Sequence, residues 1–489
     1  MNRCIHQSRS STTWLVFVAM FCALCRSAQA ADPPAKPNII MILADDLGWG
    51  DLGCYGHPHI KTPHLDRLAK SGTQFTHFYT NGSVCSPSRC ALFTGQYPAR
   101  HRIHGHYATP EQNASRGMSN WLDPEVPNVA RLLKGAGYAT AHVGKWHLGN
   151  NSGGPAIESY GFDFVGTSER DGPNGPADDP HFRARSTALF VDEGLRFIAE
   201  NKDKPFYLQI WTLVPHATLR PTDEQMKPYE QFRAGGKDFP HRSAAEIYYA
   251  SVTDLDAQIG RLIAELENLG LTNQTLILFS SDNGPEDIHV GNASHSGIGS
   301  AGPFRGRKRS LYEGGVRVPG IVCWPGHVPA ERVEDESVVA GVDWLPTVCR
   351  LAGATIPDAH SLDGEDVSDV MLGQSRARAK PLMWEWRFGI AGEVFHHSPM
   401  LAIREGGWKL LMNPDRSRVE LYDIGRDPTE LTNEAQREPE LVQRLASSVL
   451  AWQKELPSGP VHPSAGGHEY PWPGKSRPPR GDAGVKGKR

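Results

Sequence analysis

The sequence lacks several features that would place the protein in a specialised class. After residue 30 it has no apolar run long enough to cross a bilayer, it has no excess of basic over acidic side chains, and it has no internal repeats. The net charge of −4 argues against a nucleic-acid-binding protein. What remains is a chain of 489 residues, 39% apolar and 22% charged, which is ordinary for a globular protein with a large core and more than one domain.

The first thirty residues have the pattern of a signal peptide. Arg3 and Arg9 precede an apolar run over residues 14–24, and Ala28-Gln29-Ala30 supplies the small residues found before a cleavage site. The run is too short to span a bilayer comfortably. We therefore expect cleavage near Ala30 and an exported protein, periplasmic or secreted, without stable membrane insertion. A retained N-terminal anchor is the alternative.

Cysteine is scarce, and its number is odd in the expected mature chain. Three of the eight cysteines leave with the signal peptide, and the remaining five are Cys54, Cys85, Cys90, Cys323 and Cys349. In an oxidising compartment at least one of five must be unpaired or modified. Cys85 is the candidate. Cleavage also leaves 48 basic and 55 acidic side chains, a net charge of −7, which again does not fit a nucleic-acid partner.

Continuous apolar runs alternate with helical patterns over the first 350 residues. The runs cover residues 38–43, 138–143, 205–213 and 275–279, and they are typical of strands buried on both faces. Helical spacing of apolar residues appears between them, most clearly over residues 247–266. This order predicts an α/β fold with a large, mostly parallel sheet flanked by helices.

The pattern changes towards the C-terminus. Short strands are expected over residues 384–388, 400–404, 408–412 and 419–422, with Gly406-Gly407 as a hairpin turn, and a helix over residues 438–452. This predicts a smaller α+β subdomain with an antiparallel sheet. The predicted organisation is a signal peptide (1–30), a catalytic domain (31–378), this subdomain (379–456) and a disordered tail rich in Pro, Gly and basic residues (457–489).

Polar side chains follow each of the four long apolar runs. They are Asp45 and Asp46, Lys145 and His147, His216, and Asp282 and Asn283. In open α/β sheets ligands bind outside the carboxyl ends of the strands, so these groups are expected to converge on one edge. The three aspartates and the asparagine offer hard oxygen ligands that suit Ca²⁺ or Mg²⁺ and fit zinc or copper poorly. Any one Asp after a strand is more often a helix cap or turn residue, but two such pairs favour a metal.

The stretch from Ser83 to Gly95 contains the candidate cysteine. Ser86 suits an N-cap and Pro87 suits the first helical position, so Cys85 is expected one residue before a helix start. An anionic group there would be stabilised by free backbone N–H groups and the helix dipole, with Arg89 one turn along. Half of a disulfide is the simpler interpretation of Cys85.

Positive and proton-transferring groups accompany the predicted metal site. Arg89, Lys145 and Lys308 would neutralise the oxygens of a tetrahedral oxyanion, while His147 and His216 could donate or accept protons. With a divalent cation these groups suit the hydrolysis of a sulfate or phosphate ester. Each lysine or histidine taken alone is more often structural.

Two segments carry a resemblance to a known family. Cys85-Ser86-Pro87-Ser88-Arg89 followed by Thr94-Gly95 resembles the signature of type I sulfatases, in which the cysteine is oxidised to Cα-formylglycine. Gly137-Tyr138-Ala139-Thr140, continuing to Gly144-Lys145-Trp146-His147, resembles the second signature of the family. The resemblance extends from the strand before Asp45 to residues 312–315, and loosely to 421–423, which is most of the mature chain.

The resemblance implies an alkaline-phosphatase-like fold and a hydrated formylglycine at Cys85, made by a separate formylglycine-generating enzyme. One hydroxyl would attack sulfur, and the other would later expel sulfate and regenerate the aldehyde. The positions that match the calcium ligands are Asp45, Asp46, Asp282 and Asn283. Arg89 would orient the formylglycine, Lys145 would bind it and the sulfate, and His147 would be the base for elimination. His216 and Lys308 would hold the sulfate and assist the departing alcohol.

The chain departs from the family where Arg307 and Arg309 flank Lys308, because the family commonly has glycine there. The hypothesis for this extra charge is recognition of a polyanionic substrate. Export and twelve tryptophans fit a sulfated carbohydrate, with an aryl sulfate as the simpler substrate. Tryptophans are, however, more often core residues than sugar-binding platforms. The alternative functions are a phosphodiesterase or phosphonate monoester hydrolase of the same superfamily, and an inactive glycan-binding homologue.

Overall fold

The computed structural model describes residues 36–149, 153–168, 181–233, 243–291, 295–467 and 475–476. Residues 1–35 lie outside these ranges, so the signal peptide stays a prediction. All described residues belong to one compact unit. Within the described ranges, no helix combines the length and the apolar character needed to cross a bilayer.

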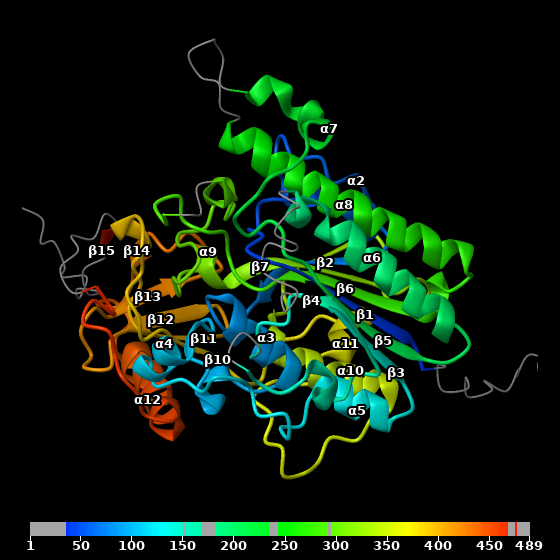
Figure 1. The fold of residues 1–489 in the computed structure, drawn as a ribbon. Coiled ribbons are helices and arrows are strands. Elements are labelled where there is room, and N and C mark those ends of the chain that lie inside the picture. The colour runs from blue at the N-terminus through cyan, green and yellow to red at the C-terminus, as the bar shows by residue number, and fades with distance from the viewer. Residues whose placement is uncertain are drawn as a thin grey trace, which may run out of the picture. The chain divides into compact units, whose positions relative to one another are not determined.

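The larger sheet has nine strands and is mostly parallel (Figure 1). Its order is β4-β3-β5-β1-β6-β7-β2-β8, with β9 also paired to β2, and β7 is antiparallel to both of its neighbours. The strands are β1 (Asn38–Ala44), β2 (Thr73–Tyr79), β3 (Ala139–Gly144), β4 (Phe164–Ser168), β5 (Phe206–Trp211), β6 (Thr275–Ser281), β7 (Arg317–Cys323), β8 (Arg332–Glu334) and β9 (Val339–Ala340). The predicted fold class is confirmed.

Helices cover both faces of this sheet (Figure 1). Strand β1 demonstrates this, because Ile40 and Ile42 belong to one core cluster and Ile39 and Met41 to another. The first cluster contains residues of α2 (Pro63–Lys70), α6 (Phe182–Asn201) and α8 (Ala244–Asn268). The second contains residues of α3 (Cys85–Thr94), α5 (Val129–Gly135), α10 (Trp344–Ala352) and α11 (Ser368–Met371). Short helices α4 (Pro110–Ser115), α7 (Asp223–Met226) and α9 (Glu313–Val316) lie in the connections.

The C-terminal region forms the predicted antiparallel sheet. Its order is β10 (Leu382–Glu385), β11 (Leu401–Glu405), β12 (Trp408–Met412) and β13 (Glu420–Asp423), and α12 (Pro439–Glu455) packs on β11 and β12. The β11–β12 hairpin turns at Gly406-Gly407, where Gly406 has a φ of 57°. The first strand lies two residues before its predicted start.

Residues 457–467, the start of the segment predicted to be disordered, contact the rest of the chain. The backbone N–H of His462 donates to the carbonyl of Arg387 at 2.9 Å, and Nη2 of Arg387 donates to the carbonyl of Pro457 at 3.0 Å. Ala465 is buried. Further along, β15 (Lys475–Ser476) pairs with β14 (Thr432–Asn433). The other tail residues lie outside the described ranges.

Strand β7 was not predicted, because Pro319 and Gly320 in its middle are typical of turns rather than strands. The structure explains the glycine. A Cβ on Gly320 would lie 2.6 Å from the ring of Phe78 on the neighbouring strand β2. The glycine therefore leaves room for a bulky cross-strand partner, which local sequence cannot reveal.

Candidate active site

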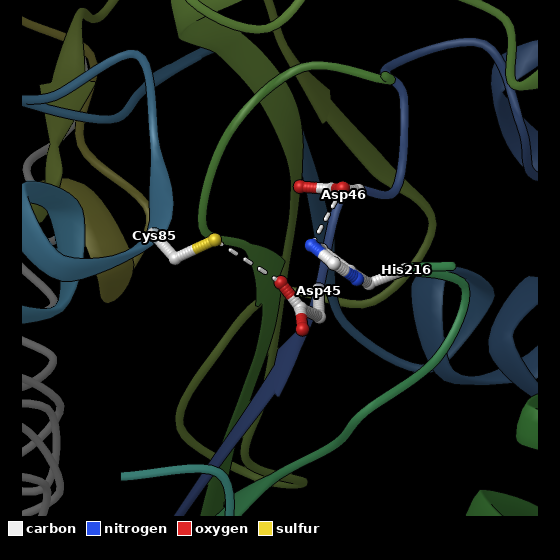
Figure 2. Close-up of side chains that lie close together, drawn as sticks. All are labelled: Asp45, Asp46, Cys85 and His216. Carbon is white, nitrogen blue, oxygen red and sulfur yellow. Dashed lines mark hydrogen bonds and ion pairs between the residues drawn. The ribbon is translucent and has the colours of Figure 1, made fainter. Parts of the chain in front are cut away.

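The four strands followed by polar residues are adjacent in the sheet. Their order is β3-β5-β1-β6, and all four are parallel, so their carboxyl ends lie at one edge. The convergence predicted from sequence is therefore observed. Ligand atoms of Asp45, Asp46, Cys85 and His216 lie within 4.8 Å of one another (Figure 2).

Asp45 has a buried carboxylate with three partners. Its Oδ2 accepts a hydrogen bond from Nζ of Lys145 at 2.6 Å, and its Oδ1 accepts one from Sγ of Cys85 at 3.4 Å (Figure 2). Nη2 of Arg89 lies 3.8 Å from the same Oδ1. Burial alone would raise the pKa of Asp45, but the positive charges of Lys145, Arg89 and Lys308 hold it well below its ordinary value. Asp45 is therefore ionised at neutral pH.

Asp46 has a φ of 67°, a left-handed conformation that residues other than glycine seldom adopt. Its Oδ2 lies 2.7 Å from Nζ of Lys308, and its Oδ1 accepts a hydrogen bond from Nδ2 of Asn283 at 2.7 Å. Nε2 of His216 lies 3.7 Å from Oδ2 (Figure 2). Such strain is kept where the surrounding contacts enforce it, as they do here.

Asp282 connects Arg89 to the metal-ligand candidates. Its Oδ2 accepts hydrogen bonds from Nε and Nη2 of Arg89 at 3.1 and 2.7 Å, and its Oδ1 accepts the backbone N–H of Asp46 at 3.1 Å. Burial and the negative charge of Asp45 raise the pKa of Asp282 to about 6, against the effect of Arg89. Three carboxylates are thus crowded together, and a divalent cation would relieve the repulsion between their negative charges.

Cys85 is the first residue of α3, whereas the sequence predicts it one residue before the start of the helix. Val84 is the N-cap, and Oγ of Ser86 instead accepts the backbone N–H of Tyr107 at 3.0 Å. The side chain still lies at the positive end of the helix. Burial raises the pKa of the Cys85 thiol, although Lys145 and Lys308 act in the opposite direction. The unmodified residue is therefore a neutral thiol and a poor nucleophile.

The five expected mature cysteines carry no disulfide in the structure, which describes all of them. Cys90 lies one turn after Ser86 in the same helix and is fully buried, with its Sγ 4.0 Å from Oγ1 of Thr94. Its surroundings are apolar and lack the charged partners of Cys85. The disulfide interpretation of Cys85 is therefore not supported.

Lys308 lies in the site despite its unusual neighbours. Its Nζ contacts Asp46 and lies 3.6 Å from Oε2 of Glu286. Arg307 does not fit the hypothesis of polyanion recognition, because its guanidinium donates hydrogen bonds to three backbone carbonyls. Those carbonyls belong to Glu286, Gly297 and Gly299, at 2.8, 3.0 and 2.6 Å. Arg309 pairs with Glu286 through both Nη atoms, at 2.5 and 3.0 Å.

The two predicted histidines are both neutral. Burial, helped by the charge of Lys308, lowers the pKa of His216 to about 4. Burial and the charges of Lys145 and Arg89 hold the pKa of His147 well below its ordinary value. Nε2 of His147 lies 3.3 Å from the carbonyl oxygen of Tyr107. A neutral imidazole is in the state that accepts a proton, as a general base must, although the two neighbouring cations make it a weaker base.

Glu286 was missed by the sequence reasoning. It holds Lys308 and Arg309 in place, and these two charges keep its pKa low, at about 2, although burial opposes them. The available signal was its position three residues after Asn283, at the same strand end.

The residues present fit a hard divalent cation. Oδ1 of Asn283 is buried and accepts no hydrogen bond from the residues that the structure describes, although the amide nitrogen of the same side chain donates two. An unpaired buried carbonyl oxygen beside three carboxylates is a set of ligands suited to Ca²⁺ or Mg²⁺. Lys145 and Lys308 meanwhile balance the charges of Asp45 and Asp46.

Comparison with known families agrees with this geometry. The model of the sulfatase family matches residues 37–354, which is more than half of the chain. The chain belongs to the sulfatase family. A second model, described as the C-terminal region of N-sulphoglucosamine sulphohydrolase, matches residues 302–455 of the sulfatase.

Curated relatives are similar over most of their length. Arylsulfatase A of Homo sapiens is 36% identical, over 75% of this sulfatase and 73% of the relative. Steryl-sulfatase of Mus musculus is 31% identical, over 91% of this sulfatase and 88% of the relative. N-acetylgalactosamine-6-sulfatase of Rattus norvegicus is 35% identical, over 70% of this sulfatase and 67% of the relative. All three are sulfuric ester hydrolases, and so is this sulfatase.

Solved structures share the fold. Ps i-CgsB in complex with k-i-k-neocarrahexaose superposes with a TM-score of 0.71 and 27% identity, over 86% of the sulfatase and 94% of that chain. The phosphonate monoester hydrolase of Agrobacterium radiobacter superposes with a TM-score of 0.61 and 22% identity, over 86% and 96%. The second likeness concerns the fold alone. The expected alkaline-phosphatase-like architecture is confirmed.

Proposed function

We propose that this sulfatase is exported and hydrolyses sulfate esters of carbohydrates through a formylglycine hydrate derived from Cys85, beside one calcium ion. The observation that carries the proposal is the position of Cys85. Its Sγ lies at the start of α3, 3.4 Å from a carboxylate of the predicted metal site. A hydroxyl at this position would be acidified by the cation and the helix N-terminus and would become a usable nucleophile.

The metal ligands in this proposal are Asp45, Asp46, Asp282 and Asn283. The cation would supply Lewis-acid stabilisation of the nucleophile and of the sulfate oxygens. Arg89 acts through Asp282, because its guanidinium holds that carboxylate and the carbonyl of Lys145, at 2.7 Å. Arg89 is therefore a positioning residue for both the metal ligand and the lysine.

The remaining side chains handle charge and protons. Lys145 and Lys308 carry ammonium groups next to the carboxylates and would bind the nonbridging oxygens of the sulfate. His147, neutral and buried, would accept the proton during elimination of sulfate. His216, with its Nε2 directed at Asp46, would assist the departing alcohol together with Lys308 (Figure 2). Cys85 would require oxidation by a separate formylglycine-generating enzyme.

A carbohydrate substrate is supported by the names of similar proteins and by the predicted export. One curated relative is an N-acetylgalactosamine-6-sulfatase, and one similar structure holds a neocarrahexaose. These names describe the substrate or ligand of those two proteins, and a carbohydrate substrate for this sulfatase is part of the proposal.

The proposal is tested by expressing the sulfatase with and without a formylglycine-generating enzyme. Turnover of an aryl sulfate is then compared with turnover of an aryl phosphodiester, followed by a desulfation screen on defined sulfated sugars. We expect sulfate release that depends on co-expression and exceeds phosphodiester turnover. Preferential turnover of the phosphodiester would replace the proposal with the phosphodiesterase alternative. Turnover of neither compound by correctly modified protein would favour the inactive homologue.

A further inference from the structure

A cavity of about 650 Å³ lies beside the catalytic cluster. Its walls come from the loop before α4 and that helix, from the loop after β10, and from residues 460–463. The last segment belongs to the stretch that the sequence predicted to be disordered. It packs closely, because a Cβ on Gly117 would lie 2.6 Å from Pro460 and a Cβ on Gly389 would lie 2.5 Å from Ser464.

The cavity adjoins the reacting groups through Arg309 and His106, which both line it. The backbone N–H of Arg309 donates to the carbonyl of Ser83 at 2.8 Å, two residues before Cys85. His106 precedes Tyr107, whose carbonyl lies 3.3 Å from Nε2 of His147. A substrate whose sulfate sits on the catalytic cluster would thus extend into this cavity.

In the described part of the chain, the cavity is lined by basic but not by acidic side chains. Of the described residues that line it, none is acidic, whereas Arg116 and Arg309 are basic. Arg309 is neutralised by Glu286. Arg116 has no carboxylate within 4.0 Å among the described residues, and its Nη1 donates only to the carbonyl of His106, at 3.1 Å. Partial burial lowers the pKa of Arg116, so its charge lacks full solvation as well as an acidic partner.

Aromatic side chains hold this arginine and line the same cavity. The guanidinium of Arg116 lies 5.7 Å from the centre of the Phe388 ring, and that ring meets Trp386 edge-on at 5.2 Å. Ligand pockets are lined mostly by hydrophobic and aromatic side chains, with a few charged or polar groups that fix the orientation of the ligand. Phe388 and Trp386 therefore supply the apolar wall, and Arg116 supplies the charge.

We propose that this cavity binds the saccharide of the substrate, and that Arg116 pairs with a second anionic group on it, a carboxylate or a further sulfate, in addition to the sulfate that is cleaved. This inference rests on the proposed carbohydrate sulfatase activity and specifies its substrate class. Arg116 is a specificity residue under this proposal. Arg307, used by backbone carbonyls, and Arg309, neutralised by Glu286, do not fill that role.

The kinetic test compares Arg116→Gln and Arg116→Lys with the parent sulfatase. The substrates are a singly sulfated neutral saccharide, a saccharide with one sulfate and one carboxylate, and a disulfated saccharide. We expect Arg116→Gln to lower the ratio of kcat/KM for a doubly anionic to the singly sulfated substrate about tenfold, mainly through KM, and Arg116→Lys to restore part of it. A fall with only one of the two anions identifies the group that Arg116 binds. Ratios unchanged for both anions would overturn the proposal.

A binding measurement separates this inference from the proposed chemistry. Cys85→Ala cannot turn over, so titration calorimetry of Cys85→Ala and of Cys85→Ala with Arg116→Gln reports affinity alone. We expect about tenfold weaker binding of the doubly anionic saccharide in the double variant. The matched control is Arg350→Gln, an exposed arginine on α10 without an ion pair among the described residues. Equal affinities in the single and double variants would contradict the cavity assignment even if the sulfatase chemistry holds.

Discussion

Nζ of Lys145 lies 2.6 Å from Oδ2 of Asp45, a residue one hundred positions earlier in the chain. Lys308 has the same relationship to Asp46, at 2.7 Å. Each of the two neighbouring carboxylates therefore has its own lysine. Burial opposes the charge on both lysines, but the facing carboxylates raise the pKa of each ammonium group, so both remain charged.

Replacing either lysine should remove a donor that stabilises charge on the transferred sulfate. We expect Lys145→Met and Lys308→Met each to lower kcat for an aryl sulfate about 10²- to 10³-fold. The control is Lys70→Met, since Lys70 also faces one carboxylate, Glu331 at 3.6 Å, but both side chains are exposed. Steady-state kinetics with all three variants provide the measurement. A loss below tenfold in both site variants would show that these lysines serve stability rather than turnover.

Removing the metal should affect both turnover and stability, because it leaves Asp45, Asp46 and Asp282 crowded and buried. We expect a chelator to abolish sulfate release and to lower Tm by several degrees, and Ca²⁺ to restore both better than Zn²⁺. Elemental analysis should find about one calcium per chain. Asp282→Asn should bind the metal more weakly. Full activity in protein shown to hold no divalent metal would contradict the assigned ligands.

Cys85 and Cys90 lie five residues apart in the same helix, α3, but should differ completely in function. Cys85→Ala should eliminate sulfate release with little change in Tm. Cys90→Ala should retain activity and lose about 1 kcal/mol of stability, because it leaves a small void in the core. Mass spectrometry of the peptide that contains both residues should find one converted cysteine in active protein. An intact thiol at position 85 in active protein would exclude the formylglycine mechanism.

A buried charge cluster connects strand β12 of the smaller sheet to helix α9, which leads into β7 of the larger sheet. Nζ of Lys409 lies 2.9 Å from Oε1 of Glu313 and 3.0 Å from Oε1 of Glu430, and all three side chains are fully buried. Removing the lysine leaves two buried carboxylates without this partner, so Lys409→Met should lower the free energy of unfolding by about 3–5 kcal/mol. Urea unfolding measures this. Lys454→Met, on the last turn of α12, is the surface control. A change below 1 kcal/mol for Lys409→Met would mean that the cluster is energetically neutral.

The same cluster predicts how stability depends on pH. Burial and the negative charge of Glu313 raise the pKa of Glu430 to about 7, although Lys409 opposes them. The folded protein thus binds a proton more tightly than the unfolded chain does, so this contribution to stability is complete below about pH 4.5 and is lost as pH rises towards 7. Glu430→Gln should remove this part of the pH dependence of Tm. An identical pH profile in the parent and the variant would contradict the raised pKa.

Much of the architecture was predictable because its signals are local. The run from Ile39 to Leu43 is apolar at every position, which predicts a strand covered on both faces, and β1 is buried along its whole length. The turn at Gly406-Gly407 was predictable for the same reason. Strand β7 and the order of segment 457–467 were not, because both depend on neighbours distant in sequence. Phe78 requires Gly320, and Arg387 holds the segment through Pro457 and His462.

The sequence by itself determined the fold class, the edge of the sheet where the site lies, and the kinds of side chain gathered there. Each of these signals lies within a short stretch of sequence, in a strand or directly after it. Only the tertiary structure decided which side chains pair. It assigned Lys145 to Asp45, Lys308 to Asp46 and Arg89 to Asp282. It also distinguished Arg116 from Arg307 and Arg309. All three are cations in the sequence, but whether a cation meets a carboxylate, a backbone carbonyl or an open cavity depends on segments that meet only after folding.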